Sequence, residues 1–285
     1  MAAVGGAGAL SYGVQVVPAL GTGGRHVRLG RIAHPEGTGF PFVAIQRNDE
    51  GDEVAAEIRE HPFGTPDFTG RQWPLADVRL LAPILPSKVV CIGKNYAEHA
   101  REMGGEPPAD PVMFLKPSTS VVGPALPIRL PADSTHVDFE GELAVVIGQP
   151  CRDVPRAKAK DVILGYTVAN DVTARDQQRA DGQWTRGKGH DTFCPLGPWI
   201  ETEIDPSDLA VRTELDGELR QDGRTSQLLH DVPALVEWVS RVMTLLPGDV
   251  ILTGTPAGVG QIRDGQSVSI TVEGIGTLTN PVVSR

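Results

Sequence analysis

One strand-like stretch of the chain carries alternating acidic residues: His136-Val-Asp-Phe-Glu-Gly-Glu-Leu-Ala-Val-Val-Ile-Gly148. In a β-strand every second side chain lies on the same face. One face of this strand therefore carries Asp138, Glu140, Glu142, Ala144 and Val146. Acids on the core-facing side repel one another and lose hydration unless a cation neutralises them. The pattern fits a metal site or, alternatively, a frayed strand end whose acids face water.

The flanking sequence, from residue 84 to residue 285, predicts one main domain rich in strands. The expected strands are Lys88–Ile92, Val112–Leu115, Glu142–Ile147, Val162–Ala169, Val250–Thr253 and Ser267–Val272. One longer helix, Val232–Leu246, is expected from its apolar stripe, and Pro247-Gly248 is expected to end it. Many strands and few helices favour a β-sandwich or barrel-like roll over a doubly wound array.

Two shorter regions precede this domain. Residues 28–83 contain strand-like pieces, Arg28–Ala33 and Phe42–Gln46, separated by turn-forming residues, and predict a small β-rich domain. Residues 1–27 hold seven glycines and one charged residue, Arg25, and are expected to be a disordered extension. An alternative is that translation naturally starts near Val27.

The composition excludes several classes of protein. The net charge of −10 argues against a general binder of nucleic acid or of anionic membranes. The apolar runs are far shorter than the roughly 20 residues of a membrane-spanning helix. Three scattered cysteines are too few for a disulfide framework or a zinc site. We therefore expect a cytoplasmic enzyme with neither nucleic-acid nor membrane partners.

A further acid, Asp171, follows the predicted strand Val162–Ala169. Because Val172–Gln178 is expected to begin a helix, Asp171 by itself is more typical of a helix cap than of a metal ligand. Combined with Glu140 and Glu142, it would complete an all-oxygen site. Such a site suits Mg²⁺, Mn²⁺ or Ca²⁺ far better than zinc.

A candidate general base lies in the glycine-flanked segment Gly93–Gly105. Tyr96–Met103 is long enough for two helical turns, which makes His99 and Glu102 neighbours at positions i and i+3. A carboxylate at that distance can orient an imidazole as a general base. The alternative is a surface helix with an incidental pair. Glycine and proline on the C-terminal side give the flexibility that a lid requires.

Two glycine-rich loops complete the set of candidates. Trp184–Asp191 carries Arg186, Lys188 and His190, which either attract an anionic substrate or form a solvated basic loop. Thr253–Gly260 lacks the Gly-Lys-Ser/Thr ending of a phosphate-binding loop. It is expected instead to form a tight turn that presents Thr255 to a pocket.

Four of these segments, in this order, resemble the fumarylacetoacetate hydrolase superfamily. They are Gly93-Lys-Asn-Tyr-x-x-His99, Phe139-Glu-Gly-Glu-Leu143, Asn170-Asp-Val-Thr-Ala-Arg-Asp176 and Thr253-Gly-Thr-Pro-x-Gly-Val-Gly260. Each motif is weak alone, but the ordered set is specific, and the resemblance runs from Lys88 to the C-terminus. The N-terminal region is similar to that of bacterial members called 2-hydroxyhepta-2,4-diene-1,7-dioate isomerases.

The resemblance implies a mixed β-sandwich roll, a homodimer and one Mg²⁺ or Mn²⁺ per subunit. The metal ligands that it implies are Glu140, Glu142 and Asp171. The implied catalytic residues are His99 and Glu102 of the lid and the active-site lysine Lys188, and the implied substrate contacts are Arg175, Gln178 and Thr255. Eukaryotic fumarylacetoacetate hydrolases add a fourth carboxylate ligand where this chain has Lys94-Asn95. That departure favours the smaller substrates of the acylpyruvate, oxaloacetate and isomerase branch.

The activity implied is metal-dependent chemistry on a 2-oxo acid through a stabilised enolate. Hydrolysis of the C–C bond of an acylpyruvate or a fumarylacetoacetate-type substrate is the main expectation. Isomerisation of a 2-hydroxyhepta-2,4-diene-1,7-dioate type and decarboxylation of oxaloacetate use the same enolate and remain open. The non-enzymatic alternative is a metal-dependent carboxylate-binding protein, and a general base argues against it.

Overall fold

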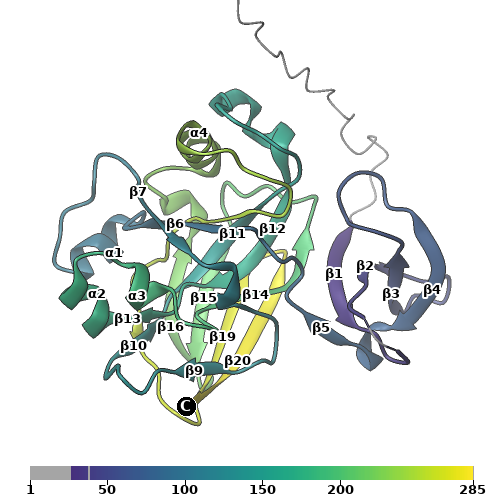
Figure 1. Cartoon of the computed structure of the whole chain (residues 1–285), viewed down its shortest axis with the longest axis horizontal. Coiled ribbons are helices and arrows are strands. Elements are labelled where there is room, and N and C mark those ends of the chain that lie inside the picture. The colour runs from purple at the N-terminus through teal and green to yellow at the C-terminus, as the bar shows by residue number, and fades with distance from the viewer. Residues whose placement is uncertain (1–26, 38, 285) are drawn as a thin grey trace, which may run out of the picture.

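The computed structural model describes residues 27–37 and 39–284, and strands dominate it (Figure 1). Within these residues the strands form sheets of twelve, five and three strands. The predicted fold, a mixed β-sandwich roll with a small β-rich N-terminal domain, is confirmed. Residues 1–26 of the expected extension lie outside the described part. Its last residue, Val27, accepts a hydrogen bond from Thr202 Oγ1 at 2.9 Å and so belongs to the folded body.

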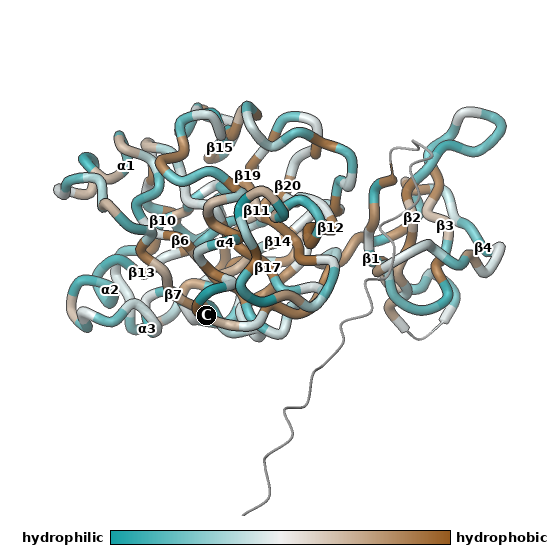
Figure 2. Tube along the Cα trace, turned by 90° about the horizontal axis from the view of Figure 1, so that it is seen from above, coloured by the Kyte–Doolittle hydropathy of each residue, from teal (hydrophilic) through white to brown (hydrophobic). Residues whose placement is uncertain are grey.

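The N-terminal strands form an antiparallel meander at the end of the large sheet. They are β1 (Arg28–Ala33), β2 (Phe42–Arg47), β3 (Glu53–Ile58) and β4 (Phe68–Pro74). The turn between β2 and β3 forms because Asn48 Oδ1 accepts hydrogen bonds from the backbone of Glu50 and Asp52. β1 also pairs with β5 (Arg79–Leu81) and with β14 (Cys194–Glu201). Hydrogen bonds therefore connect the small domain, at the right of Figures 1 and 2, to the larger body.

The larger body is built around the remaining strands of the large sheet. These are β6 (Val89–Gly93), β7 (Val112–Lys116), β8 (Val121–Val122), β11 (Gly141–Ile147), β12 (Ile163–Asn170), β14 and β17 (Val250–Leu252). β11 lies between β12 and β17, and every residue of it is buried. Figure 2 shows hydrophobic residues concentrated along these central strands.

A second sheet packs against the first and closes the core. It runs in the order β16 (Glu218–Arg224), β15 (Ala210–Leu215), β19 (Ser267–Val272), β20 (Gly276–Ser284) and β9 (Ile128–Leu130). Leu143 and Val145 of β11 share one apolar cluster with Ile270 of β19. Ala144 and Val146, on the opposite face of β11, belong to a different cluster. Side chains of β11 therefore alternate as predicted, and its two faces contribute to different apolar clusters.

A small third sheet contains β10 (Val137–Phe139), β13 (Thr173–Ala174) and β18 (Gly260–Gln261). The stretch 136–148 was expected to be one strand, but it passes from this sheet to the large one at Glu140. The backbone of Glu140 is held there by Asn170 and Asp171, because Asn170 Oδ1 accepts from its N–H and its carbonyl accepts from Asp171 N–H. The two sheets therefore meet at the acidic residues.

The α-helices of the described part are α1 (Ala97–Glu102), α2 (Arg175–Asp181), α3 (Thr185–Lys188) and α4 (Val232–Val242). Short 3₁₀ turns occur at Leu75–Asp77, Ser118–Ser120, Arg156–Val162 and Thr225–Gln227. The helix expected over Val232–Leu246 ends four residues early, because Leu245 forms an isolated β-bridge with Cys151 and is fully buried. None of the described helices is both long enough and apolar enough to span a membrane.

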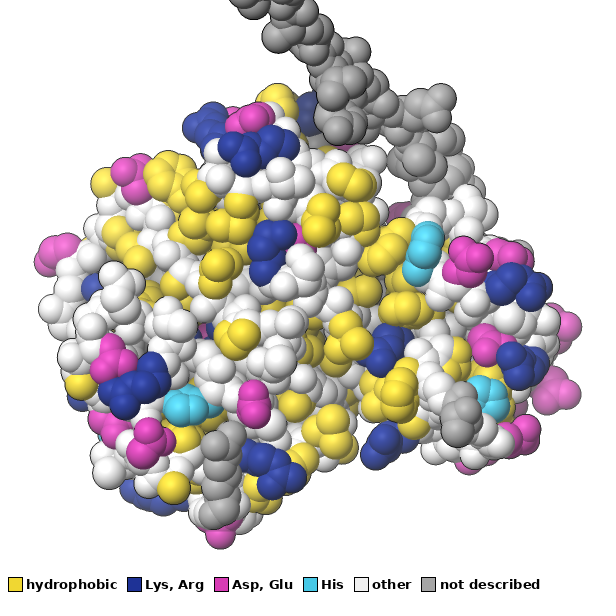
Figure 3. Space-filling view, in the orientation of Figure 1, with side chains coloured by type: hydrophobic (Ala, Val, Ile, Leu, Met, Phe, Trp, Pro, Cys, Tyr) yellow, Lys and Arg dark blue, Asp and Glu magenta, His cyan; other side chains and the backbone are white. Residues whose placement is uncertain are grey.

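Figure 3 shows one face of the molecular surface. On the face drawn in Figure 3, basic and acidic side chains are intermixed and no continuous basic patch is visible. On the same face, apolar side chains lie in separate groups, the largest of them in the upper part of the larger body. Inside, Cys91 and Cys194 are fully buried free thiols, and burial raises the pKa of the Cys194 thiol to about 12. Cys91 lies on β6 and packs in the core as a small apolar side chain.

Candidate active site

Three predicted ligands converge where the two sheets meet. Glu140 directly precedes β11, Glu142 is the second residue of β11, and Asp171 directly follows the antiparallel partner strand β12. One carboxylate oxygen from each lies within 4.8 Å of the others, and all three residues are buried. Asp171 is no helix cap, since β13 follows it and α2 begins only at Arg175. The expected helix start at Val172 is therefore wrong by three residues.

Two cations neutralise part of this acidic cluster. Lys188 Nζ donates to Glu140 Oε2 at 2.8 Å and to Asp171 Oδ2 at 2.7 Å, and Arg175 forms an ion pair with the other Glu140 oxygen. Burial alone would raise the pKa of Glu140, but Arg175 and Lys188 outweigh it and hold that pKa well below its usual range. The two acids likewise outweigh burial at Lys188 and raise the pKa of its ammonium group.

Glu142 has no such cation partner among the described residues. Its Oε2 accepts a hydrogen bond of 2.6 Å from the backbone N–H of Gly254. Burial, together with the negative charges of Asp171 and Glu140, raises the pKa of Glu142 well above its usual value. A divalent cation would relieve this excess of negative charge. The oxygen-only donor set of Glu140, Glu142 and Asp171 therefore fits a hard ion such as Mg²⁺ or Mn²⁺.

The predicted base stands on the short helix α1. His99 Nδ1 lies 3.1 Å from Glu102 Oε2, and the His99 side chain is buried. The other Glu102 oxygen accepts a hydrogen bond of 3.0 Å from Gly258 N–H. Glu102 thus both orients the imidazole and connects α1 to the loop Thr253–Gly260. Gly258 has φ +100°, and a Cβ there would lie 2.1 Å from the Arg220 carbonyl oxygen, so this turn requires glycine.

Lys94 and Asn95 occupy the position at which the family resemblance implies a fourth carboxylate ligand in eukaryotic hydrolases. Asn95 is buried, and its amide donates to the carbonyls of Thr253 and His230 and accepts from His230 N–H. Asn95 therefore holds the backbone before α1 in place. Lys94, at φ +57°, lines the cavity beside the acids.

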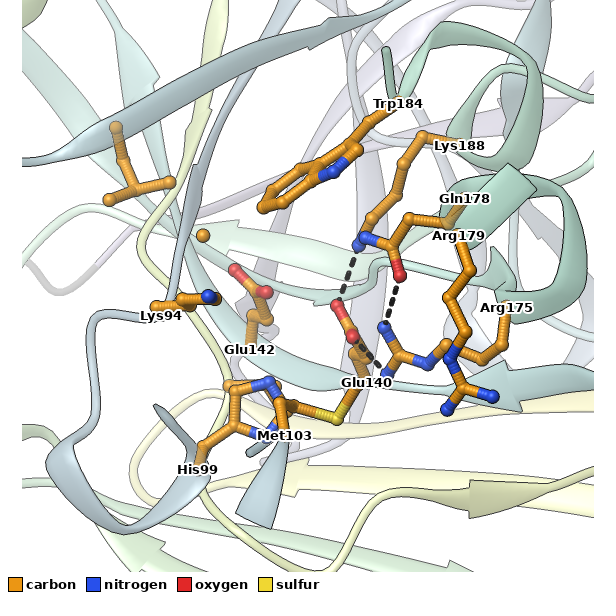
Figure 4. A pocket seen from close by; sticks show the side chains of 13 residues that line it. Lys94, His99, Met103, Glu140, Glu142, Arg175, Gln178, Arg179, Trp184 and Lys188 are labelled. Carbon is orange, nitrogen blue, oxygen red and sulfur yellow. Dashed lines mark hydrogen bonds and ion pairs between the residues drawn. The ribbon is translucent and has the colours of Figure 1, made fainter. Parts of the chain in front are cut away.

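A cavity of about 230 Å³ opens above the acidic cluster (Figure 4). The predicted residues that line it are His99, Glu140, Glu142, Arg175, Gln178, Lys188 and Thr255. Glu102 and Asp171 stand behind this lining, in contact with His99 and Lys188 respectively. Ile92, Gly93, Lys94, Met103, Arg179 and Trp184 complete the wall.

The residues expected to contact substrate hold other protein groups in this structure. The Arg175 nitrogens donate to Asp138, Glu140 and Gln178. Thr255 Oγ1 donates to the Gly141 carbonyl at 2.9 Å and accepts from Gln221 Nε2 at 2.7 Å. Their roles as substrate contacts remain predictions. Arg175 forms an ion pair with Glu140 and so holds that carboxylate in place.

The basic loop expected at 184–191 contains a short helix, α3. Its basic side chains have partners in different places. Arg186 pairs with Asp181 at the surface, and His190 Nε2 lies 2.7 Å from Gln177 Oε1. Lys188 and Trp184 are the members of this segment that line the cavity. The structure therefore does not support a loop whose basic side chains act together to attract an anion.

A second buried lysine, Lys116, was not identified from the sequence. Its Nζ lies 2.6 Å from Asp171 Oδ1 and donates to the carbonyls of Lys188 (2.6 Å) and Val172 (3.0 Å). It thereby links Asp171 to the backbone of α3. The available signal was a lysine directly after the apolar strand Val112–Leu115, and this lysine is the last residue of β7.

The Lys116→Met variant should lose about 3 kcal/mol or more of unfolding free energy. Asp171 Oδ1 and two buried backbone carbonyls lose their donor, and only Lys188 still pairs with Asp171. Urea unfolding in the presence of a chelator measures the loss without a contribution from bound metal. The control is Lys158→Met, which removes an exposed lysine that pairs with Asp161 at 3.3 Å. That change should stay within about 0.5 kcal/mol. Equal losses in the two variants would contradict a special role of Lys116.

Two family models match the chain. The family model described as fumarylacetoacetate (FAA) hydrolase C-terminal matches residues 88–283, and a model described as Rv2993c-like, N-terminal matches residues 27–83. The crystal structure of 2-hydroxyhepta-2,4-diene-1,7-dioate isomerase from Mycobacterium marinum is 66% identical, with a TM-score of 0.84 over 91% of this chain and 99% of that one.

Two relatives with different activities are also similar. The mitochondrial oxaloacetate tautomerase fahd2 of Xenopus laevis is 44% identical over 73% of this chain and 69% of its own length. The structure of fumarylpyruvate hydrolase from Pseudomonas aeruginosa in complex with Mn²⁺ and pyruvate is 35% identical, with a TM-score of 0.67 over 73% of this chain and 92% of that one.

Proposed function

This chain belongs to the fumarylacetoacetate hydrolase family, and from that premise we propose that it is a divalent-metal-dependent enzyme that hydrolyses the C–C bond of an acylpyruvate. The observation that carries the proposal is the His99–Glu102 pair, because Glu102 orients His99, which lines the same cavity as Glu140 and Glu142. A protein that only binds carboxylates has no use for an oriented base. The acidic cluster supports a site for a hard cation in reach of that base.

Glu140, Glu142 and Asp171 would hold Mg²⁺ or Mn²⁺, which supplies Lewis acidity toward an oxygen that gains negative charge. Arg175 and Lys188 keep Glu140 ionised and in place. Lys188 also brings a positive charge into the cavity, where it favours a substrate anion. The apolar wall, which includes Trp184, reduces the access of bulk water.

His99 is proposed as the base that activates water. With Glu102 ionised, Nδ1 donates to it, and Nε2 is left as the basic nitrogen. Nε2 takes a proton from water, and the water oxygen forms a bond to the distal carbonyl carbon. The C3–C4 bond then breaks and leaves its electron pair on C3 as the enolate of pyruvate. Protonation of C3 gives pyruvate, and the acyl part leaves as a carboxylic acid.

Tautomerisation or isomerisation of a 2-oxo acid is the second candidate. The relatives named isomerase and tautomerase favour it, and it needs the same enolate but no attacking water. Decarboxylation of oxaloacetate belongs to the same group. These reactions differ from hydrolysis in the fate of the enolate rather than in the residues that would stabilise it.

A product assay tests the proposal. The purified chain with Mg²⁺ or Mn²⁺ is incubated with acetylpyruvate, fumarylpyruvate, oxaloacetate and a hydroxymuconate-type dienol, and NMR follows the products. Pyruvate plus a carboxylic acid from either acylpyruvate is the expected result. Interconversion of tautomers without C–C cleavage would favour the second candidate. No metal-dependent conversion of any of them would support the carboxylate-binding alternative.

We also propose that the enzyme is a homodimer, as the family resemblance implies. The apolar groups exposed on the face of Figure 3 support a surface that a second copy can cover. Light scattering at micromolar concentration is expected to give about twice the chain mass of 30.3 kDa. A monomer mass would contradict this part of the proposal.

A further inference from the structure

Gln221, on β16, has a side-chain amide that uses every hydrogen bond it can form. The residue is fully buried and does not itself line the cavity. Its Oε1 accepts from Gly141 N–H at 2.9 Å and from Thr213 Oγ1 at 2.7 Å. Its Nε2 donates to Thr255 Oγ1 and to the Pro256 carbonyl, both at 2.7 Å. A carboxamide has two donor protons and an oxygen that accepts two bonds, so all four positions are occupied.

Two backbone groups determine the orientation of this amide. The N–H of Gly141 can only donate, and the carbonyl of Pro256 can only accept. Oε1 must therefore face Gly141, and Nε2 must face Pro256, because a flipped amide would place donor against donor and acceptor against acceptor. Since Nε2 donates to Thr255 Oγ1, the hydroxyl proton of Thr255 is directed to the Gly141 carbonyl, 2.9 Å away.

These bonds hold both peptide units between two of the proposed metal ligands, Glu140 and Glu142. Gly141 is the single residue between them. Its N–H, in the peptide unit that follows Glu140, is bonded to Gln221 directly. Its carbonyl, in the peptide unit that precedes Glu142, is bonded to Gln221 through the hydroxyl of Thr255. Because peptide units are planar, holding one atom of each unit restricts the directions in which the two carboxylate side chains leave the backbone.

The same amide also holds the loop Thr253–Gly260 against β16. Its bond to the Pro256 carbonyl connects the loop to the strand, and the contact is close, because a Cβ on Gly223 of β16 would lie 2.5 Å from the Pro256 Cβ. The loop in turn supplies the N–H of Gly254, which donates to Glu142 Oε2 at 2.6 Å. A displaced loop would therefore move a donor that orients Glu142.

We propose that Gln221 is a positioning residue of the metal site. From the five-stranded sheet it fixes the backbone between Glu140 and Glu142 and the loop that holds the Glu142 carboxylate. This inference rests on the proposed function, which places a divalent cation at these acids. Partners that orient the ligands of a metal contribute to its affinity although they do not touch it. Gln221 acts in this way through Gly141, Thr255 and the loop.

The Mn²⁺ affinity of the full chain and the electron paramagnetic resonance spectrum of bound Mn²⁺ test the proposal. Gln221→Met has a similar shape but loses the four hydrogen bonds. It should bind Mn²⁺ about 10- to 100-fold more weakly and change the spectrum. Gln221→Asn keeps the amide but is one methylene shorter, so it cannot reach Gly141 and Pro256 together. It should lose about tenfold in affinity, and it tests the proposal even if Gln221→Met does not fold.

A conservative variant and a matched control complete the experiment. In Gln221→Glu, burial favours the neutral carboxyl group, which can replace the acceptor bonds and one of the two donor bonds. Its Mn²⁺ affinity should stay within about threefold of that of the parent chain. The control is Asn280→Leu on β20 of the same sheet, a buried amide that donates to the carbonyls of Gly123 and Leu126. It should lower stability but keep the parent affinity and spectrum.

The outcomes separate this inference from the function on which it rests. If Gln221→Met and Gln221→Asn keep the parent affinity and spectrum, or if Asn280→Leu changes them equally, Gln221 is an ordinary core amide and the inference is wrong. The proposed function then still stands on the binding of Mn²⁺ by the parent chain. If the parent chain binds no Mn²⁺, both the proposed function and the inference are overturned.

Discussion

Glu142→Gln should bind Mn²⁺ about 100-fold more weakly than the parent chain, and its metal-dependent activity should fall below detection. One of three anionic ligands is lost, and even residues that only orient a ligand change metal affinity by roughly 10- to 100-fold. The fold should survive. Because burial and the neighbouring acids raise the pKa of Glu142, a neutral side chain of the same shape is tolerated there without metal. The glutamine carbonyl can still accept from Gly254 N–H.

Mn²⁺ titration calorimetry measures this loss, and circular dichroism checks the fold. The matched control is Glu214→Gln, which neutralises an exposed acid on β15 at the same cost in net charge. It should keep the parent affinity. Undiminished Mn²⁺ affinity in Glu142→Gln would remove Glu142 from the ligand set.

His99→Ala should reduce hydrolysis of an acylpyruvate by roughly 10²–10⁴, the usual contribution of a positioned general base. Decarboxylation of oxaloacetate, if the enzyme performs it, should fall much less because no water attacks. Glu102→Gln should follow the same pattern more mildly. It keeps the imidazole but weakens its orientation, while the amide oxygen can still accept from Gly258 N–H.

Rates of acylpyruvate hydrolysis and of oxaloacetate decarboxylation, measured for each variant at saturating Mg²⁺, test whether His99 serves only to activate water. The matched control is Glu98→Gln, an exposed acid on the same helix α1 that does not line the cavity. Equal losses in the two reactions of His99→Ala would mean that the imidazole also handles the enolate proton or keeps the lid closed. No loss in either would make His99 an incidental histidine of the lid.

Local patterns located some of the elements, whereas strands such as β14 and β15 had no predicted counterpart. Arg28–Ala33 and Ser267–Val272 form strands with the predicted bounds, and the strand expected over Val112–Leu115 extends by one residue. The alternation of side chains in a strand is a local property, so the sequence alone assigned Glu140 and Glu142 to one face. The end of α4 was missed because the pairing of Leu245 with Cys151 is a tertiary contact.

The sequence also identified seven of the thirteen residues that line the cavity, although their chemical roles stay predictions. Amino-acid order alone placed His99 beside Glu102, because helical spacing determines which side chains are neighbours three positions apart. It likewise restricted any metal to a hard cation, since the donors in these motifs are carboxylates.

Only the tertiary structure brings together groups that are distant in sequence. Asp171 reaches Glu140 because β12 runs antiparallel to β11, and Lys116 reaches Asp171 from β7 across the sheet. The balance of charge follows from those contacts. Lys188 and Arg175 pair with Glu140 and Asp171, whereas Glu142 has no cation partner among the described residues. Periodicity reports which face a side chain occupies, but Coulomb energy depends on distances in space that only tertiary packing sets.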